Sequence, residues 1–463
     1  MPQMNKTMKF KRRWQKIFLS ISLCVFTTLV TLHWHNPKPA IAATTYYVAT
    51  NGNNSNPGTQ TQPFATLAYA VSKVKAGDTV YMRGGTYYLT QKIWIPHKGT
   101  ASAPITFQAY PGEKVIIDGS KLPTNDGVAL SIGGEYITIK GFEVRNAKDT
   151  GLVIWGGKHI KFLNNIVHDS QRHGIFGSYT DLNQVTDILI EGNTVYHNNL
   201  QNSSHNSQIA MALGIGGVGN IKIINNKVYE NQGEGIDFWG VGALISRNTV
   251  YDNYSVEMYL DGASNTTVER NLIYTTYNSK YYRSGHPASG IQVANEHGKT
   301  QLDKNKIVNN IAIGGSWGFY YGNYSKGGGM RNMLIANNTF YKGTRGIIGI
   351  NQDAGHQNTV FANNIFYQTP QAGMTWFSAN SAFKFFNNCW YGGSAGPGAG
   401  VGDVYANPKL VQPGTTKASD YKPQNGSPVI EAGSTINAVT NDYLGSTRPL
   451  GQKYDIGAYE YSS

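Results

Sequence analysis

Three carboxylates interrupt two apolar segments in the middle of the sequence. Asp237 lies in GEGIDFWG (residues 233–240), and Glu257 and Asp261 lie in VEMYLD (residues 256–261). Two carboxylates about 5 to 5.5 Å apart can serve a retaining glycosidase, and several carboxylate oxygens together can bind Ca²⁺. A solvated strand with occasional charge has the same composition. These three carboxylates could therefore bind a metal, act in acid–base chemistry or simply be solvated. The neighbouring Glu234 is interpreted as a turn residue.

Two long insertions supply further candidates. Arg283, in TTYNSKYYRSGHPASG, can bind a sugar carboxylate or assist proton transfer, and His173 or His205 can act as a base. The candidates for binding sugar rings and hydroxyls are Trp239, Tyr259, Tyr281, Tyr282 and Gln292. Each candidate also has a structural interpretation, because loop arginines are commonly solvated and loop tyrosines commonly pack.

A repeat must position all of these side chains. Its copies are NNIVH, GNTVYH, NNKVYE, RNTVYD, RNLIY, NNIA, NNTFY, NNIFY and NNCWY, and their second residues are Asn165, Asn193, Asn226, Asn248, Asn271, Asn310, Asn338, Asn364 and Asn388. Successive asparagines are 22 to 39 residues apart. Short alternating strands and Gly or Asn turns at this spacing predict an all-β protein, a parallel β-solenoid with insertions.

Each repeated asparagine is predicted to point inward and to bond the same asparagine one coil away, about 4.8 Å along the stack. It also suits the left-handed backbone of a sharp corner, and the tyrosine after it can stack. The residues aligned as inward on the next strand are Ile175, Ile236, Met258 and Ile291. Alternation then places these side chains outward: Asp237, Trp239, Glu257, Tyr259, Asp261 and Gln292.

The two ends of the chain differ from the repeat. Residues 1–42 have a basic start, an apolar run and the ending Ala-Ile-Ala, which is typical of a cleaved secretory signal. An uncleaved membrane anchor is the alternative. Residues 43–395 are expected to form the solenoid, with an N-terminal capping α-helix at 63–74. Residues 396–463 are expected to form a C-terminal cap or an anchor-like tail.

Charge and cysteine content limit the classes of binding partner that the sequence predicts. Seven of the 39 Lys and Arg lie in the first 42 residues, which leaves 32 against 27 Asp and Glu. A charge of about +5 does not indicate a nucleic-acid partner, but it suits an acidic polymer. Cys24 lies in the predicted signal, so Cys389 has no disulfide partner. We expect a monomer that binds a polysaccharide and no nucleic acid, with cell-surface or matrix association as an option.

Two segments carry a resemblance to known families. YYVATNGNNSNPGTQTQPFATLAYAVSKVKAGDTVYMRGGTYY closely resembles the start of polysaccharide lyase family 9, within the secreted right-handed parallel β-helix superfamily of pectate-lyase-like proteins. NDYLGSTRPLGQKYDIGAYEY is similar to the choice-of-anchor Q tail of exported bacterial β-helix proteins. The family 9 resemblance implies Ca²⁺ on an acidic cluster, here Asp237, Glu257 and Asp261, and a lysine base. No lysine occupies an outward strand position in those coils.

The leading hypothesis is an exported bacterial enzyme that cleaves an acidic polysaccharide, such as pectate, by Ca²⁺-dependent β-elimination. One alternative is glycoside hydrolysis by paired carboxylates on adjacent coils. The other is a surface solenoid that binds glycans without catalysis.

Overall fold

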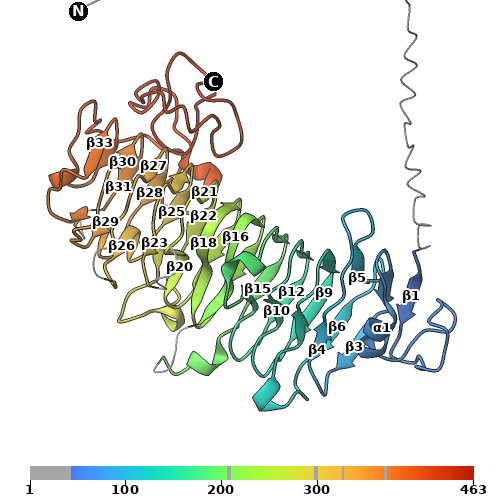
Figure 1. Cartoon of the computed structure of the whole chain (residues 1–463). Helices are drawn as coiled ribbons and strands as arrows, with labels where there is room; N and C mark the ends of the chain where they lie inside the picture. The colour runs from blue at the N-terminus through green and yellow to red at the C-terminus, as the bar shows by residue number, and fades with distance from the viewer. Residues whose placement is uncertain (1–42, 206–209, 297–300, 326–327, 370–372, 463) are drawn as a thin grey trace, which may run out of the picture. The chain divides into compact units, whose positions relative to one another are not determined.

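The computed structural model describes residues 43–205, 210–296, 301–325, 328–369 and 373–462. The predicted signal, residues 1–42, lies outside the described residues. The described residues from Ala43 onward wind as a right-handed parallel β-helix, blue to red along the solenoid in Figure 1. The predicted fold class is therefore confirmed.

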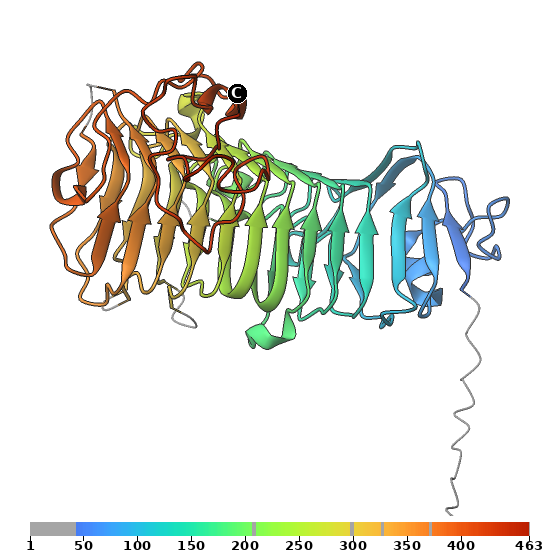
Figure 2. The same ribbon diagram turned by 90° about the horizontal axis from the view of Figure 1, so that it is seen from above.

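Each coil contributes strands to three faces, and Figure 2 shows the strands of successive coils side by side. Face 1 consists of β4 (Ile93–Ile95), β7 (Leu130–Ile132), β10 (Leu152–Trp155), β13 (Ile175–Ser178), β16 (Met211–Ile224), β18 (Glu234–Ser246), β20 (Val256–Asp261), β23 (Ser289–Ala294), β26 (Trp317–Gly322), β29 (Gly346–Ile350) and β32 (Thr375–Trp376).

Face 2 is the 12-stranded sheet of β3 (Gly85–Tyr88), β6 (Val115–Asp118), β9 (Phe142–Arg145), β12 (Ile166–His168), β15 (Thr194–Tyr196), β17 (Lys227–Tyr229), β19 (Thr249–Tyr251), β22 (Leu272–Tyr274), β25 (Ile311–Ile313), β28 (Thr339–Tyr341), β31 (Ile365–Tyr367) and β34 (Cys389–Tyr391). Face 3 consists of β1 (Thr45–Val48), β2 (Thr79–Met82), β5 (Ile105–Ala109), β8 (Ile137–Lys140), β11 (Lys161–Leu163), β14 (Leu189–Glu191), β21 (Thr267–Glu269), β24 (Lys306–Val308), β27 (Leu334–Ala336), β30 (Thr359–Ala362) and β33 (Phe383–Phe386), and the long strands β16 and β18 run on into it from face 1. Short 3₁₀ turns lie at η1 (Thr124–Asp126), η2 (Leu182–Gln184), η3 (Leu200–Asn202), η4 (Ser279–Tyr281), η5 (Gly396–Gly398) and η6 (Ala418–Tyr421).

Aliphatic and aromatic side chains fill the bore. The four residues predicted to point inward, Ile175, Ile236, Met258 and Ile291, all lie in this core. Ile175 pairs with Leu213 of β16, and Leu213 pairs with Ile236. The sequence alignment did not include the β16 coil, so β13 and β18 are one coil further apart than that alignment suggested.

The predicted asparagine ladder is confirmed. The side-chain Nδ2 of each repeat asparagine from Asn165 onward donates to Oδ1 of the next, as far as Asn388, over 2.9 to 3.0 Å. The expected left-handed backbone, however, belongs to the residue before each ladder asparagine, such as Asn164 (φ 53°) and Asn225 (φ 56°). The corner residue turns the chain, and the next side chain then enters the bore. The tyrosines also stack as expected, with ring centroids 4.5 to 5.2 Å apart from Tyr196 to Tyr274.

A short helix covers the N-terminal end of the core. Helix α1 (Leu67–Lys73) starts later than predicted because Thr66, not Pro63, precedes it as the N-cap, and Thr66 Oγ1 accepts a hydrogen bond from Tyr69 N at 3.2 Å. Its apolar residues Leu67, Ala70 and Val71 are buried in the core. Within the described residues, no helix has the length and apolar character needed to span a membrane.

The segment after residue 395 has two parts. Val401 and Val404 extend the last coil through parallel bridges to Phe386 and Cys389. Residues from 406 onward then lie along the outer side of face 2, over the orange coils of Figure 1. Four corner asparagines hold this flank segment by donating from Nδ2 to main-chain carbonyls at 2.7 to 3.0 Å: Asn309 to Asn441, Asn337 to Asp455, Asn363 to Ser434 and Asn387 to Ala432.

Candidate functional site

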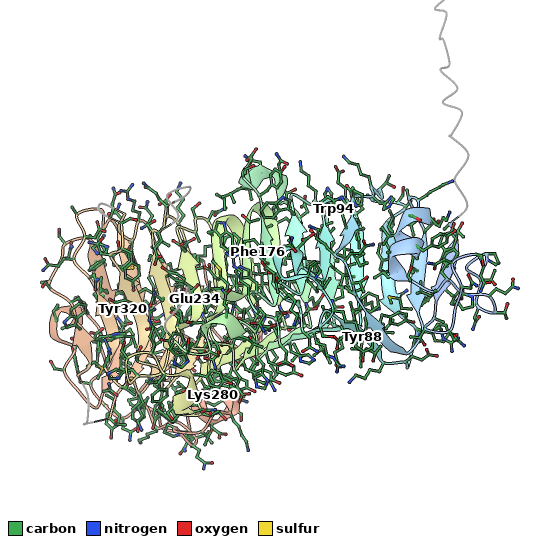
Figure 3. All side chains as sticks on the ribbon, turned by 90° about the horizontal axis from the view of Figure 1, so that it is seen from below. Tyr88, Trp94, Phe176, Glu234, Lys280 and Tyr320 are labelled. Atoms are coloured by element: carbon green, nitrogen blue, oxygen red, sulfur yellow. The ribbon has the colours of Figure 1, made fainter. Side chains whose placement is uncertain are left out.

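One outward side chain per coil forms a row along face 1. Strand register aligns Trp94, Ser131, Val153, Phe176, Gly214, Asp237, Tyr259, Gln292, Tyr320, Gly349 and Trp376 in that order. Asp237 is the middle member, with each end about 24 Å away at about 4.8 Å per coil. Figure 3 shows labelled members Trp94, Phe176 and Tyr320, with Glu234 among them, following one another along the solenoid. Asp237, Tyr259 and Gln292 thus occupy the outward positions that alternation predicted.

Asp237 is fully buried, although it faces away from the bore. Among the described residues, neither of its carboxylate oxygens has a hydrogen-bond partner. Burial raises the pKa of Asp237 well above its ordinary value, and the negative charges of Glu234 and Glu296 raise it further. This environment therefore favours the neutral form of Asp237 over the charged form.

Glu234 lies on the same strand, and it is partly exposed. Burial raises the pKa of Glu234 to about 7, Glu296 adds to the rise, and the positive charge of Arg283 opposes it. A carboxylate that titrates near neutral pH is suited to general acid–base chemistry. Its interpretation as a turn residue is wrong, because Glu234 is the first residue of β18 and its main-chain N–H donates to Ala210 O at 3.1 Å.

Glu296 follows β23 and completes a group that we call the carboxylate cluster: Glu234, Asp237 and Glu296. The hydroxyl of Tyr259 donates to Glu296 Oε1, and the main-chain N–H of Glu296 donates to Asp261 Oδ1 at 2.6 Å. Burial, and then the charge of Glu296, raise the pKa of Tyr259. The phenol therefore keeps its proton at neutral pH and holds it in the hydrogen bond to Glu296.

Arg283 lines a pocket of about 200 Å³ that the three carboxylates of the cluster do not line, and its positive charge acts on Glu234. It pairs with His286 across a two-residue turn, Ser284–Gly285, whose φ angles of 52° and 79° are those of a type I′ hairpin turn. Arg283 Nη1 donates to Ser255 Oγ at 2.8 Å. Arg345, Gln292, Tyr320 and Tyr324 also line the pocket. Two guanidinium groups therefore border one small polar cavity, which suits an anionic ligand.

Glu257 does not join the site, contrary to prediction. Glu257 is buried, and its carboxylate accepts two hydrogen bonds from Asn253. One comes from the main-chain N at 3.1 Å and the other from the side-chain Nδ2 at 2.6 Å. Asn253 ends a second asparagine ladder, in which Nδ2 of Asn198 donates to Asn231 at 3.1 Å and Nδ2 of Asn231 donates to Asn253 at 2.8 Å. These asparagines each follow a first-ladder asparagine by five positions. That spacing was a usable signal in the sequence, and it makes Glu257 the terminus of a structural ladder.

We therefore expect Glu257→Gln to leave catalysis intact and to change only the pH dependence of stability. Burial, together with the charge of Asp252, raises the pKa of Glu257 well above its ordinary value. The wild-type protein should lose stability as pH rises from about 4 toward the folded-state pKa, because the folded state binds the proton more tightly. Urea unfolding of the Gln variant should show a flatter pH profile, with a cost of about 1 kcal/mol at low pH. A large fall in catalysis with the fold intact would restore the predicted catalytic role.

The predicted metal group is not assembled either. Glu257 is engaged in the ladder, and Asp261 accepts the main-chain bond from Glu296. Within the described parts of the chain, no three Asp, Glu, His or Cys side chains are arranged so that they could hold a metal ion. Asp237, Glu257 and Asp261 thus do not fit the Ca²⁺ site that the sequence suggested.

The two predicted histidine bases lie elsewhere. His173 is buried, its Nδ1 is 2.9 Å from Met211 O, and burial lowers its pKa to about 4. His205 contacts Gln232 Oε1 through Nε2 at 2.8 Å and stacks on Tyr254, with centroids 4.1 Å apart. Neither lines the Arg283 pocket. Both are held by structural contacts.

Only some of the predicted sugar-binding residues lie at the Arg283 pocket. Gln292 lines the Arg283 pocket. Tyr281 is buried and Tyr282 is partly exposed, and neither lines that pocket. Trp239 is buried over Gly216 and lies 5.8 Å from the Phe176 ring. It therefore supports the face rather than projecting from it.

A family model described as "Pel9A-like, right handed beta helix region" matches residues 46–358, which is more than half of the chain. The chain belongs to this family. The uncharacterized protein YwoF of Bacillus subtilis (strain 168) is 30% identical over 352 residues, covering 65% of this Pel9A-like chain and 70% of YwoF.

Two relatives of the Pel9A-like chain carry the name pectate lyase. Pectate lyase L of Paenibacillus polymyxa (strain SC2) is 28% identical over 287 residues, 58% of this chain and 57% of that protein. Pectate lyase PEL9 of Emericella nidulans is 47% identical over 85 residues, 18% of this chain and 21% of that protein. The matches thus span less than two thirds of either named lyase.

Solved structures agree on the architecture. Pectate lyase Pel9A superposes with a TM-score of 0.58 at 22% identity, over 91% of this chain and 98% of that one. XylC in complex with xylose gives a TM-score of 0.61 at 14% identity, over 91% and 99%. At these identities the likeness shows the shared fold.

Proposed function

We propose that this Pel9A-like chain is a polysaccharide lyase that cleaves a uronate-containing polymer by β-elimination. One observation carries the proposal: Glu234, partly exposed and with a pKa of about 7, lies close enough to Arg283 for the guanidinium charge to lower that pKa. A base and a carboxylate-binding cation are the two groups that the reaction needs. The names of two relatives support the substrate class.

In the proposed reaction, Glu234 removes the proton from C5 of the uronate, next to the sugar carboxylate. The electron pair of the C5–H bond forms the C4–C5 double bond, and the C4–O4 bond breaks. The proton that Glu234 has taken up, or a proton from solvent, then passes to the leaving oxygen O4, so that Glu234 is free to act again. Tyr259 donates a hydrogen bond to Glu296 and holds that carboxylate in place. Burial raises the pKa of Asp237, and the charges of Glu234 and Glu296 raise it further, which favours its neutral form near an anionic substrate.

Arg283 and Arg345 neutralise the uronate carboxylate in this proposal. Both border the same pocket. A guanidinium group binds a carboxylate through two parallel hydrogen bonds, which fixes the orientation of the sugar as well as its charge. Calcium dependence stays a prediction, and no step is assigned to a metal, because the acidic residues do not form the expected ligand group.

The test is incubation of residues 43–463 with polygalacturonate, alginate and a neutral glycan, with and without a chelator. We expect ultraviolet absorbance of unsaturated uronides from an acidic polymer. Persistence of this absorbance with the chelator would show that the arginines suffice. Loss of that product on chelation would support calcium instead. Reducing ends without the absorbance would indicate the hydrolase alternative, and glycan binding without any product would contradict both enzymatic functions.

Export is part of the proposal, and it is supported by the signal-like sequence of residues 1–42. A long polymer outside the cell is a fitting substrate for a row of side chains that runs the length of face 1. The monomeric state and surface association stay predictions.

A further inference from the structure

An aromatic pocket of about 780 Å³ lies at the N-terminal part of the face 1 row. Trp94 and Trp155 line it with 43% and 48% of their surfaces exposed, and Phe176 lines it with partial exposure. Figure 3 shows Phe176 between Trp94 and Glu234 along the solenoid. Exposed aromatic groups that gather around one cavity usually mark a binding site.

The rings are held in place before any ligand arrives. Trp94 packs against Gly133, where an added Cβ would come within 2.1 Å of the indole. Tyr179 packs edge-on against Trp155, with centroids 5.8 Å apart. Phe176 stacks on His173, with centroids 4.5 Å apart. Binding would therefore order few side chains, and this favours affinity.

Charges around this pocket are close to balance, unlike those around the Arg283 pocket. Lys92 is already paired with Asp126 at 2.8 Å. Arg172 and Asp149 contribute one charge of each sign to the lining. His173 is neutral near pH 7, because burial lowers its pKa to about 4. The pocket thus offers apolar ring faces with polar groups at their edge and little net charge.

We propose that this pocket binds a neutral oligosaccharide, whose pyranose rings stack on Trp94 and Trp155 while Thr150, Asp149 and Arg172 bind its hydroxyl groups. The flat apolar face of a neutral sugar matches an indole, and its equatorial hydroxyls match a polar rim. Phe176 is two coils from Asp237 in the same row, about 10 Å. A glycan bound here is therefore in line with the carboxylate cluster. The inference does not depend on the proposed lyase reaction, since it concerns binding alone.

The test is calorimetric titration of residues 43–463 with cellohexaose, xylohexaose, β-1,4-galactohexaose and hexagalacturonate. We expect at least one neutral hexaose to bind with a Kd of about 1 mM or tighter. Trp94→Ala and Trp155→Ala should each weaken that binding about tenfold. Trp94→Tyr keeps a stacking ring and should retain most of the affinity, which separates loss of stacking from loss of fold.

Trp376→Ala is the matched control, because Trp376 is 55% exposed at the opposite end of the same row. It should leave neutral-hexaose binding unchanged. Binding of hexagalacturonate alone, equal sensitivity to Trp376→Ala, or no response to the Trp94 and Trp155 variants would each overturn the proposal. So would the absence of binding by every neutral hexaose. A chain with no lyase activity can still pass this test, so the two proposals fail separately.

Discussion

Glu234→Gln is expected to lower the lyase rate by about 10²- to 10⁴-fold with the fold intact, because it removes the proposed general base. The loss should appear mainly in kcat, since the neutral amide occupies the same volume and Arg283 still binds the substrate. Initial rates of unsaturated product formation measure the effect, and circular dichroism verifies the fold.

The pH profile gives a sharper readout of the same prediction. A base acts when deprotonated, so the wild-type rate should rise as pH passes through the pKa of Glu234, about 7. Glu296 raises that pKa and Arg283 lowers it. Glu296→Gln should therefore move the rising limb to lower pH, and Arg283→Met should move it to higher pH and also raise KM. Shifts in the same direction in both variants would argue against Glu234 as the titrating group.

Glu191→Gln is the matched control for Glu234→Gln. Glu191 ends β14 on face 3 and is partly exposed. The Glu191→Gln substitution makes the same chemical change away from the face 1 row, and it should leave the lyase rate within about twofold of the wild-type rate. Full activity of Glu234→Gln would reject the proposed base, and Asp237→Asn would then be the next variant to measure.

Arg448→Met is expected to destabilise the protein by about 3 to 5 kcal/mol, because it leaves a buried carboxylate without its cation. The side chains of Arg448 and Glu460 are 0% and 1% exposed, and they form an ion pair. Arg448 Nη2 also donates to Asn309 Oδ1 at 3.0 Å and to Gly457 O at 2.8 Å, which ties the flank segment to the solenoid. Urea unfolding should show the loss, and limited proteolysis should show faster cleavage after residue 405.

Two comparisons test the cause of that loss. Lys98→Met removes an ion pair to Glu135 in which the lysine side chain is 70% exposed, and it should cost less than about 1 kcal/mol. Arg448→Met combined with Glu460→Gln removes the uncompensated charge and should recover part of the stability. Equal stability of wild type and Arg448→Met would show that the buried pair does not hold the flank segment.

The repeat could be predicted from the sequence because its interactions are periodic. A ladder asparagine bonds a copy of itself one coil away, so the same residue must recur once per coil, and the pattern is visible along the chain. The inward row with Ile236 and Met258 follows from alternation. The outward register of Asp237 and Tyr259 follows from the same rule.

Only the tertiary structure decided which carboxylates meet. Glu257 shares a coil with Tyr259, yet its side chain turns to Asn253 at the corner, because buried main-chain and amide N–H groups there need an acceptor. Glu234 and Glu296 come from different coils and insertions of different length, so no period relates them. The flank segment is likewise fixed by contacts more than a hundred residues apart, as between Asn309 and Asn441. Sequence determines what repeats from coil to coil, whereas side-chain direction and insertion geometry, set by local hydrogen-bond demand and burial, determine the site.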